Sequence, residues 1–453
     1  MTLHRAFLPA CVTTLVVGAV AAHAQSDVCA DAPWVGPGTL FVDNDFYALD
    51  GPSSCTASRD AWVRYLPQTP GTLQLSELIA DSGGSMAVYL GCPSGPGQEL
   101  ACVAFDGSAV LSLPVRSLNA YYIRVSADGP FGDTVLTMAG PPAARVVGTD
   151  GADGQYSTID DALSAAQSGD TIYVLPGTYS RFTVVNKSLK IVGAAGPNAT
   201  AIQGTSIATN GVVELAGLFA KPITVVPALD ASFNASVQAT NCVFRGVGGA
   251  GPVQSRSSAT VTLHGCLLLG GSAGAYSTVN GMLRLVNCTI ANSGAGVYHN
   301  DAANAGVSLV NCVIDAPTPI GGPFAPHVLA TYSRIAGGWP GVGNISDDPQ
   351  FVDPDGPDGV PFTADDDYRL ANTSPCIDAG DMYAESRLVF DLDGAPRVVD
   401  HPGHLNEGGL PVAVDMGAYE SQPAPCEGDL TGDGRVALDD LSILLTQFGA
   451  ICN

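Results

Sequence analysis

Four segments between residues 236 and 315 repeat one pattern of hydrophobic and polar positions. In each, hydrophobic residues occupy the fifth and third positions before a cysteine and a polar residue lies between them, which is the period-two alternation of a half-buried β-strand. After this alternation the phase shifts, because the cysteine and the second residue after it are now the hydrophobic pair. A strand keeps its period, so the shift predicts a corner between two strands. The cysteines that mark the repeat are Cys242, Cys266, Cys288 and Cys312.

The residue at each predicted corner, directly before the cysteine, is Asn or Gly. These residue types tolerate the left-handed backbone conformation that a tight bend requires. The cysteines recur every 22 to 24 residues, and a period of about 20–50 residues is typical of stacked repeats. We therefore expect one strand, corner and second strand per coil of a solenoid. The corner residues are Asn241, Gly265, Asn287 and Asn311.

This repeat resembles the right-handed parallel β-helix of the pectate-lyase type over residues 145–350. The stretch "YSTIDDALSAAQSGDTIYVLPGTY" (156–179) resembles the capping helix and first coil of that superfamily, and "YSRIAGGWPGVGNISDDPQFVD" (332–353) resembles a closing phrase of many bacterial members. The resemblance implies stacked coils about 4.8 Å apart, with the four cysteines in one inward column. We expect free thiols there, because parallel in-register side chains rarely reach the disulfide torsion.

Two flanking regions resemble modules of secreted bacterial proteins. Residues 25–142, with short alternating strands such as "DAWVRYLPQTPGTLQLSEL", resemble the β-sandwich of the pre-peptidase C-terminal type, which is an accessory module without catalytic residues. Residues 351–421 contain "DYRLANTSPCIDAGD", "DLDGAPRVV" and "VDMGAYE". These phrases resemble the anchor-type segment that follows many β-helices, and the resemblance implies that the segment completes the last coils.

The N-terminus is typical of a secretory signal peptide. Arg5 precedes an apolar stretch, and Ala22-His23-Ala24 forms a cleavage site, so residues 1–24 are expected to be removed. We therefore expect a secreted protein, extracellular or at the cell surface, where disulfides form. The expected pairs are Cys92 with Cys102, Cys29 with Cys55, and Cys426 with Cys452.

The composition limits the partners. Charged residues make up 13% of the 453, alongside 54 Gly and 32 Pro, which favours short strands and turns in an all-β chain. The formal charge of −25 repels nucleic acid and anionic membranes and attracts cations such as Ca²⁺. No later apolar stretch reaches the roughly 18 residues that a membrane span needs. We therefore expect neither nucleic-acid binding nor a membrane span.

The stretch "GDLTGDGRVALDDL" (428–441) matches a calcium-binding loop of the EF-hand type. Such a loop places oxygen ligands at positions 1, 3, 5, 7 and 12 and glycine at position 6, which is Gly434 here. The apolar spacing that starts at Leu441 predicts an amphipathic helix. Residues 426–453 resemble one half of a type I dockerin, which implies Ca²⁺ and a protein docking partner, although dockerins carry two loops. The expected ligands are Asp429, Thr431, Asp433, the carbonyl of Arg435, and Asp440.

A second acidic loop, "DPDGPDGVPFTADDD", combines acids with Gly and Pro. It is either a further Ca²⁺ site or a solvated turn, and the sequence leaves both open. The candidate ligands are Asp353, Asp355 and Asp358.

Two functions stay open. The β-helix resemblance implies a polysaccharide lyase or a glycoside hydrolase, and hydrolysis needs a pair of carboxylates. Between residues 171 and 300 the only acids are Glu214 and Asp230. We therefore favour a protein without a catalytic site that either binds polysaccharide or a cell-surface glycan or serves as an extracellular interaction scaffold, with an enzyme of polysaccharide catabolism as the alternative. The candidate glycan-binding residues are Arg284, which is expected to point outward, and His299 with Asp301 in the predicted turn "YHND".

Overall fold

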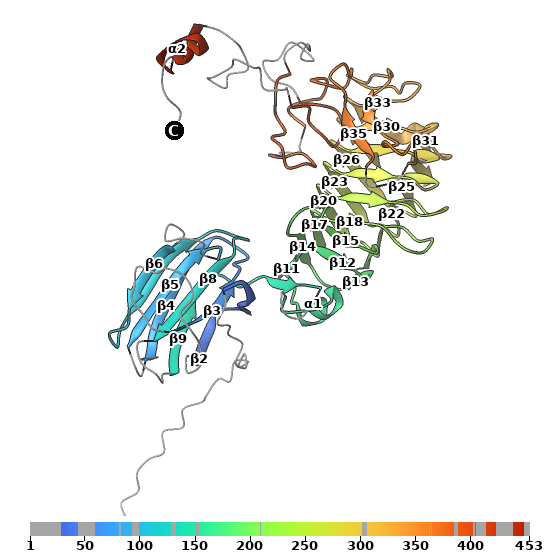
Figure 1. Cartoon of the computed structure of the whole chain (residues 1–453). Coiled ribbons are helices and arrows are strands. Elements are labelled where there is room, and N and C mark those ends of the chain that lie inside the picture. The colour runs from blue at the N-terminus through green and yellow to red at the C-terminus, as the bar shows by residue number, and fades with distance from the viewer. Residues whose placement is uncertain are drawn as a thin grey trace, which may run out of the picture. The chain divides into compact units, whose positions relative to one another are not determined.

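The computed structural model describes residues 29–43, 59–80, 83–92, 99–127, 133–149, 154–208, 210–300, 306–361, 363, 365–384, 388–401, 404, 414–422 and 438–447 (Figure 1). The chain divides into two compact units. One comprises Met1–Ala144 with Ala152–Gln155, and the other comprises Arg145–Gly151 with Tyr156–Asn453.

The first unit contains two β-sheets that share one hydrophobic core, which includes Val63 and Ile123 from one sheet and Leu73 and Leu136 from the other. All neighbouring strands are antiparallel except β1 and β3. One sheet has the order β1 (Trp34–Val35), β3 (Arg59–Tyr65), β8 (Tyr121–Ala127), β5 (Gly84–Leu90) and β6 (Glu99–Ala104). The other has the order β2 (Gly38–Asp43), β9 (Asp133–Ala139), β4 (Gly71–Ala80) and β7 (Val110–Val115).

The disulfide of this unit corrects the expected pairing. Cys29, at the start of a short 3₁₀ helix (Cys29–Asp31), is bonded to Cys92. The pairs Cys92 with Cys102 and Cys29 with Cys55 are therefore wrong. The reason lies in the β5–β6 register, which places Cys102 opposite Ala87 rather than Cys92. Cys102 is disulfide-bonded as well, while Cys55, Cys426 and Cys452 lie outside the described residues.

The second unit is a parallel β-solenoid built from three sheets, which confirms the predicted β-helix (Figure 1). The first sheet contains β10 (Arg145–Val147), β11 (Thr171–Val174), β14 (Leu189–Gly193), β17 (Val212–Ala216), β20 (Ser236–Thr240), β23 (Thr260–His264), β26 (Met282–Val286), β29 (Val307–Val310) and β32 (Val328–Thr331). The second contains β12 (Gly177–Tyr179), β15 (Thr200–Ile202), β18 (Phe219–Ala220), β21 (Val243–Arg245), β24 (Leu267–Leu269), β27 (Thr289–Ala291), β30 (Val313–Asp315) and β33 (Arg334–Ile335). The third contains β13 (Phe182–Val185), β16 (Thr205–Ala208), β19 (Leu229–Ser232), β22 (Val253–Ser255), β25 (Ala273–Thr278), β28 (Ala295–Asn300) and β31 (Thr318–Gly321).

The predicted corner lies between the first and second sheets. Asn241, Gly265, Asn287 and Asn311 have φ of 49°, 60°, 52° and 53°, which is the left-handed conformation expected for them. The hydrophobic columns before and after the corner are buried as predicted. The four repeat cysteines are buried free thiols, and the Cys312 thiol, for example, donates to the carbonyl of Val310 at 3.3 Å.

The N-terminal end of the solenoid carries the predicted capping helix. Helix α1 (Ile159–Ala165) starts at Thr158, whose hydroxyl accepts a hydrogen bond from the Asp161 amide at 3.1 Å. Such a cap satisfies one of the backbone N–H groups that a helix start leaves unpaired. The buried face of α1, including Ile159 and Leu163, joins the core of the solenoid.

The described residues between 351 and 422 do not add coils to the solenoid. Strands β34 (Phe351–Asp353) and β35 (Asp367–Leu370) form a separate antiparallel pair, and the described residues from 351 to 422, here called the side segment, pack on the outer face of the second sheet. The cause is visible in β24, whose sequence Leu-Leu-Leu is hydrophobic on both faces and so has to be covered on both. This corrects the expectation that the segment completes the last coils.

The C-terminal helix predicted after the calcium-binding loop is present as α2 (Leu438–Gln447). Asp440 belongs to this helix, whereas Asp429, Thr431, Asp433 and Arg435 lie outside the described residues, so the calcium site stays a prediction. In the described part of the chain, no helix combines the length and the hydropathy needed to cross a membrane.

Candidate functional site

The residues proposed from the sequence for glycan binding are not brought together. Arg284 lies in β26, half-buried between the inward Leu283 and Leu285, and thus points outward as predicted. His299 lies in β28, in a different sheet. Asp301 is outside the described residues.

The expectation that His299 occupies a polar turn is wrong. Strand β28 continues to Asn300, and this places His299 inside the solenoid with 0% of its surface exposed. Its Nδ1 lies 3.3 Å from the Ser277 hydroxyl of the coil before. A side chain buried in this way cannot contact a polysaccharide from outside.

The described residues of the second proposed calcium loop are not gathered into a metal site. Asp353 ends β34, and Asp355 and Asp358 are exposed in the following turn. Among the described residues, no three Asp, Glu, His or Cys side chains are grouped so that they could hold a metal ion. Calcium at this loop stays a prediction.

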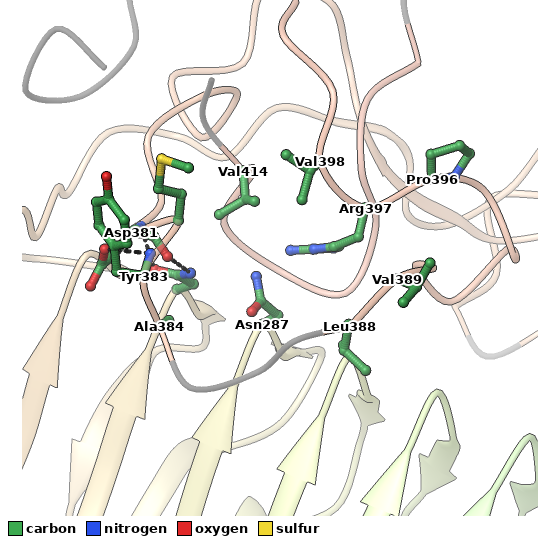
Figure 2. A pocket seen from close by; sticks show the side chains of 12 residues that line it. Asn287, Asp381, Tyr383, Ala384, Leu388, Val389, Pro396, Arg397, Val398 and Val414 are labelled. Atoms are coloured by element: carbon green, nitrogen blue, oxygen red, sulfur yellow. Dashed lines mark hydrogen bonds between the residues drawn. The ribbon is translucent and has the colours of Figure 1, made fainter. Parts of the chain in front are cut away.

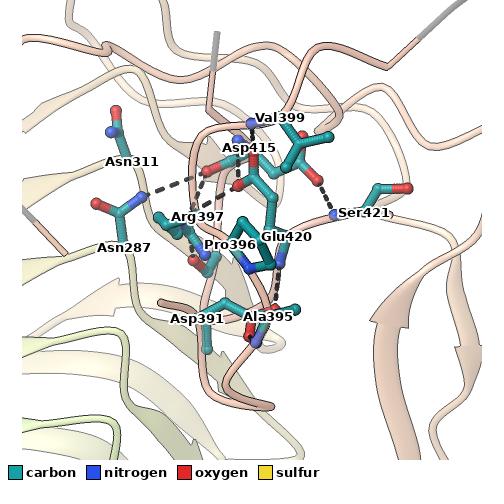
Figure 3. Close-up of polar contacts among 12 residues, drawn as sticks. Asn287, Asn311, Asp391, Ala395, Pro396, Arg397, Val399, Asp415, Glu420 and Ser421 are labelled. Atoms are coloured by element: carbon teal, nitrogen blue, oxygen red, sulfur yellow. Dashed lines mark hydrogen bonds and ion pairs between the residues drawn. The ribbon is translucent and has the colours of Figure 1, made fainter. Parts of the chain in front are cut away.

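The structure instead joins the three phrases of the side segment into one buried polar network (Figure 3). Arg397, from "DLDGAPRVV", donates through Nη2 to the carbonyls of Asp415 and Gly417 at 2.8 and 2.7 Å. These two residues belong to "VDMGAYE", as does Glu420, whose main-chain amide donates to Asp391 Oδ2 at 3.0 Å. These two phrases thus hydrogen-bond to each other, and the bonds hold together backbone that forms no regular secondary structure.

The third phrase, "DYRLANTSPCIDAGD", enters the network through Asp378. Its amide donates to Asp415 Oδ1 at 2.8 Å. The other carboxylate of the network, Glu420, accepts from the amides of Val399 and Asp415 at 3.2 and 3.0 Å. Carboxylates that accept main-chain N–H groups can hold a segment without regular secondary structure in one conformation.

The network is attached to the corner of the solenoid through the stacked asparagines. Asn311 donates to the Asp381 carbonyl at 3.0 Å and accepts from the Asp381 amide at 2.7 Å. Asn241 donates to the Asp391 carbonyl at 2.8 Å, and Asn287 makes a longer contact of 3.4 Å with the Asp415 carbonyl. The asparagines therefore have two roles, since they form the bend and bind the side segment.

Burial changes the acidity of the network. It raises the pKa of Asp415 to about 6 and that of Glu420 to about 9, and the charge of Asp415 adds to the effect on Glu420. Glu420 therefore keeps its proton to a higher pH than an exposed glutamate does, although its Oε2 lies only 3.5 Å from Arg397 Nε.

We expect the solenoid unit to lose stability as the pH rises. Both pKa values lie above their ordinary values of 3.8 and 4.5, so between pH about 4.5 and 9 the folded state binds more protons than the unfolded state, and stability falls with rising pH. In Glu420→Gln this fall should shrink by on the order of 2–3 kcal/mol. Thermal unfolding of both proteins at pH 5, 7 and 9 measures it, and parallel curves would contradict the expectation.

A cavity of about 530 Å³ lies beside the network, between the side segment and the corner asparagines. Figure 2 shows the Arg397 side chain extending toward its middle, with Val398 and Val414 on one side and Asn287 on the other. Asp381 also borders it. The walls therefore combine one guanidinium, one carboxylate and several apolar side chains, and we call this space the Arg397 cavity.

A second depression, of about 480 Å³, lies on the outer face of the second sheet. Its floor contains Phe219, Val243 and Leu267, which are in register on the successive strands β18, β21 and β24. Its wall contains the aromatic rings of Tyr368 and Tyr419. The charged residues that line it are Arg245, Asp365, Asp366, Asp367, Arg369 and Asp393. We call it the acidic groove.

Two aspartates of the acidic groove share one hydrogen-bond donor. The hydroxyl of Thr363 lies 2.5 Å from Asp365 Oδ1 and 3.0 Å from Asp366 Oδ1. This hydrogen bond lowers the pKa of Asp365 below its ordinary value. Arg369 donates to Asp393 at 2.6 Å and to Asp367 at 3.1 Å, and its guanidinium lies 5.8 Å from the centre of the Tyr419 ring.

Sequence reasoning missed Arg397, Asp415, Glu420 and the lining of the acidic groove. The sequence did point to this region, because Arg397, Asp415 and Glu420 belong to the quoted phrases of the side segment. The aspartates that line the acidic groove belong to the same segment. What the sequence does not contain is the partner of each phrase. The pairing depends on contacts between residues up to 150 positions apart, such as Asn241 with Asp391.

No family model matches the chain, and no curated protein matches it. Among solved structures, pectin methylesterase PemA from Erwinia chrysanthemi matches with 14% identity and a TM-score of 0.33, over 44% of this chain and 80% of that one. The pectin methylesterase from Aspergillus niger matches with 18% identity and a TM-score of 0.28, over 46% and 87%. The catalytic domain of a GH87 α-1,3-glucanase in complex with tetrasaccharides matches with 14% identity and a TM-score of 0.23, over 68% and 69%. We transfer no residue role from these structures.

Proposed function

We propose that this is a secreted polysaccharide-binding protein, and that the acidic groove is its contact surface. The observation that supports the proposal best is the floor of the groove, where Phe219, Val243 and Leu267 follow one another on three adjacent coils. Coils repeat about every 4.8 Å, so Phe219 and Val243, which are half-buried, present apolar surface to an extended chain on two successive coils, and Leu267, 4% exposed, lies under the side segment at the end of this floor. Aromatic and aliphatic side chains cover the C–H faces of a sugar ring, and carboxylates bind its hydroxyl groups.

The charge of the groove favours a neutral polysaccharide. Four aspartates line it, against two arginines, and one of these, Arg369, is already paired with Asp367 and Asp393. A polyanionic chain would meet a net negative surface and be repelled. A neutral glycan, in contrast, can donate its hydroxyl hydrogens to the carboxylates in charge-assisted bonds.

Glycoside hydrolysis is the alternative, because Asp365 and Asp366 provide the neighbouring carboxylates that the coils lack. A general acid for this reaction needs a raised pKa. The hydrogen bond from Thr363 lowers the pKa of Asp365, so Asp365 is unsuited to the role of the general acid.

The C-terminal residues 426–453 are proposed to add a calcium-dependent attachment. The support is the spacing of Asp429, Asp433 and Asp440 in an EF-hand-like loop, followed by helix α2. In this proposal, Ca²⁺ orders the loop and the helix serves as a docking surface for a protein partner, while the solenoid contacts the glycan.

Replacing Phe219 by alanine tests the groove. We expect the affinity for a neutral polysaccharide to fall about tenfold, because an aromatic contact is worth roughly 1–1.5 kcal/mol. Phe233→Ala is the matched control, because Phe233 is 62% exposed on the same solenoid and outside the groove. The measurement is titration calorimetry against soluble glucan, xylan and polygalacturonate, with reducing ends assayed in parallel.

The outcomes separate the two functions. Weaker binding by Phe219→Ala alone, without new reducing ends, supports the proposal. Equal binding by both variants, or retention of polygalacturonate only, overturns it. Reducing ends that disappear in Asp366→Asn would establish the hydrolase instead.

A further inference from the structure

We propose that the Arg397 cavity is a binding site for a small hydroxycarboxylate, that is, a molecule with one carboxylate and at least one nearby hydroxyl group. The site is separate from the acidic groove, since no residue lines both. It therefore goes beyond glycan binding by the groove and does not depend on it.

The first observation is an unused donor group. Arg397 is 2% exposed, and both N–H groups of its Nη2 donate to main-chain carbonyls, those of Asp415 and Gly417. Nη1 is buried and has no hydrogen-bond partner among the described residues. A charged donor without an acceptor is costly in the interior, so a buried group of this kind calls for a ligand or a trapped water molecule.

The second observation is the arrangement of the nearby acids, which bind main-chain amides and approach Arg397 only at Nε, where Glu420 Oε2 lies at 3.5 Å. Asp415 accepts main-chain N–H groups from Asp378 and Ser421. Glu420 accepts from the amides of Val399 and Asp415. Neither carboxylate is bonded to Nη1. Figure 2 shows the guanidinium directed toward the middle of the cavity, and a ligand carboxylate on this side would match its planar geometry.

The third observation is the remainder of the lining. Asp381 borders the cavity, and its Oδ1 already accepts from the Tyr383 amide at 2.9 Å. A simple anion would be repelled there, whereas a hydroxyl group can donate to this carboxylate. Val398, Val414 and Leu388 cover the carbon skeleton between the two polar ends. The volume of about 530 Å³ lies within the range of small-molecule sites, about 300–1,000 Å³.

The test is titration calorimetry of the full mature chain with gluconate, gluconamide and acetate. We expect gluconate to bind, and both gluconamide and acetate to bind at least tenfold more weakly, because one lacks the carboxylate and the other lacks the hydroxyl groups. A galacturonate trimer is the fourth ligand. Binding at least as tight as that of gluconate identifies the end of an acidic glycan as the source, and weaker binding identifies a free acid.

Two variants connect the binding to the cavity. Val398→Trp fills the space without removing a hydrogen bond, and Val352→Trp is the control, because both valines are 53% exposed and only Val398 lines the cavity. Loss of gluconate binding in Val398→Trp alone supports the proposal. No gluconate binding by the unchanged protein, or equal binding by the two variants, overturns it and leaves water as the partner of Nη1. Phe219→Ala should bind gluconate normally, so this site and the groove can fail independently.

Discussion

Replacing Asp60 by alanine is expected to lower the free energy of unfolding of the first unit by about 3–5 kcal/mol. Asp60 in β3 accepts from Arg124 Nε in β8 at 2.5 Å, and the two side chains are 0% and 2% exposed. Without Asp60, a guanidinium remains buried beside Trp62 with no opposite charge at this position. Such an uncompensated charge is among the most destabilising changes in a protein interior.

Urea unfolding followed by tryptophan fluorescence measures this effect in a Trp339→Phe background, in which only Trp34 and Trp62 of the first unit report. The control is the double variant Asp60→Ala with Arg124→Met, which removes both charges and should recover most of the lost stability. If the double variant were as unstable as the single one, the loss would come from packing rather than from the unpaired charge.

Asn311→Ala should cost the second unit about 3–4 kcal/mol. Roughly 1–2 kcal/mol comes from holding alanine at the positive φ of this corner, and the rest from leaving the Asp381 amide and carbonyl without their buried partner. Asn311 is completely buried and makes both of these bonds. Because they hold the side segment on the solenoid, we also expect faster proteolysis within the side segment.

Two controls divide this loss into its parts. Asn186→Ala is the matched change, because Asn186 has a φ of 51° but is exposed, so only the backbone part should be lost there. Asn311→Gly should recover the backbone part and still release the side segment. Equal stability of Asn311→Ala and Asn186→Ala, with unchanged proteolysis, would show that the asparagine does not hold the segment.

The coils could be predicted almost residue by residue because their information is local. Alternation with period two, a phase shift and an Asn or Gly at the shift specify a strand, a corner and a second strand within about ten residues. The neighbours of Asn287, for instance, are enough to predict that it lies at the corner, and its φ is 52°. The free thiols follow from the same logic, since stacking fixes the direction of every inward side chain.

The candidate sites could not be predicted in this way because they depend on distant pairing. The sequence shows "YHND" as a polar phrase, but only the coil register shows that His299 stacks on Ser277 inside the solenoid. Likewise, Cys92 and Cys102 are close in sequence, but the hairpin register places Cys102 opposite Ala87. The role of Arg397 likewise appears only in the fold, where its side chain donates to the carbonyls of Asp415 and Gly417 in another phrase.

Because the side segment binds the corner asparagines, it fixes the number of coils that it covers. Repeats of a solenoid contact only their neighbours, so the loss or gain of one coil would by itself leave a stack that can still form. Here, however, Asn241, Asn287 and Asn311 bind three different places along one covering segment. Removing a coil between them would displace Asn311 from Asp381 by about 4.8 Å. Changes in coil number are therefore restricted to coils outside the stretch from Asn241 to Asn311, and this stretch has a length fixed by the segment that covers it.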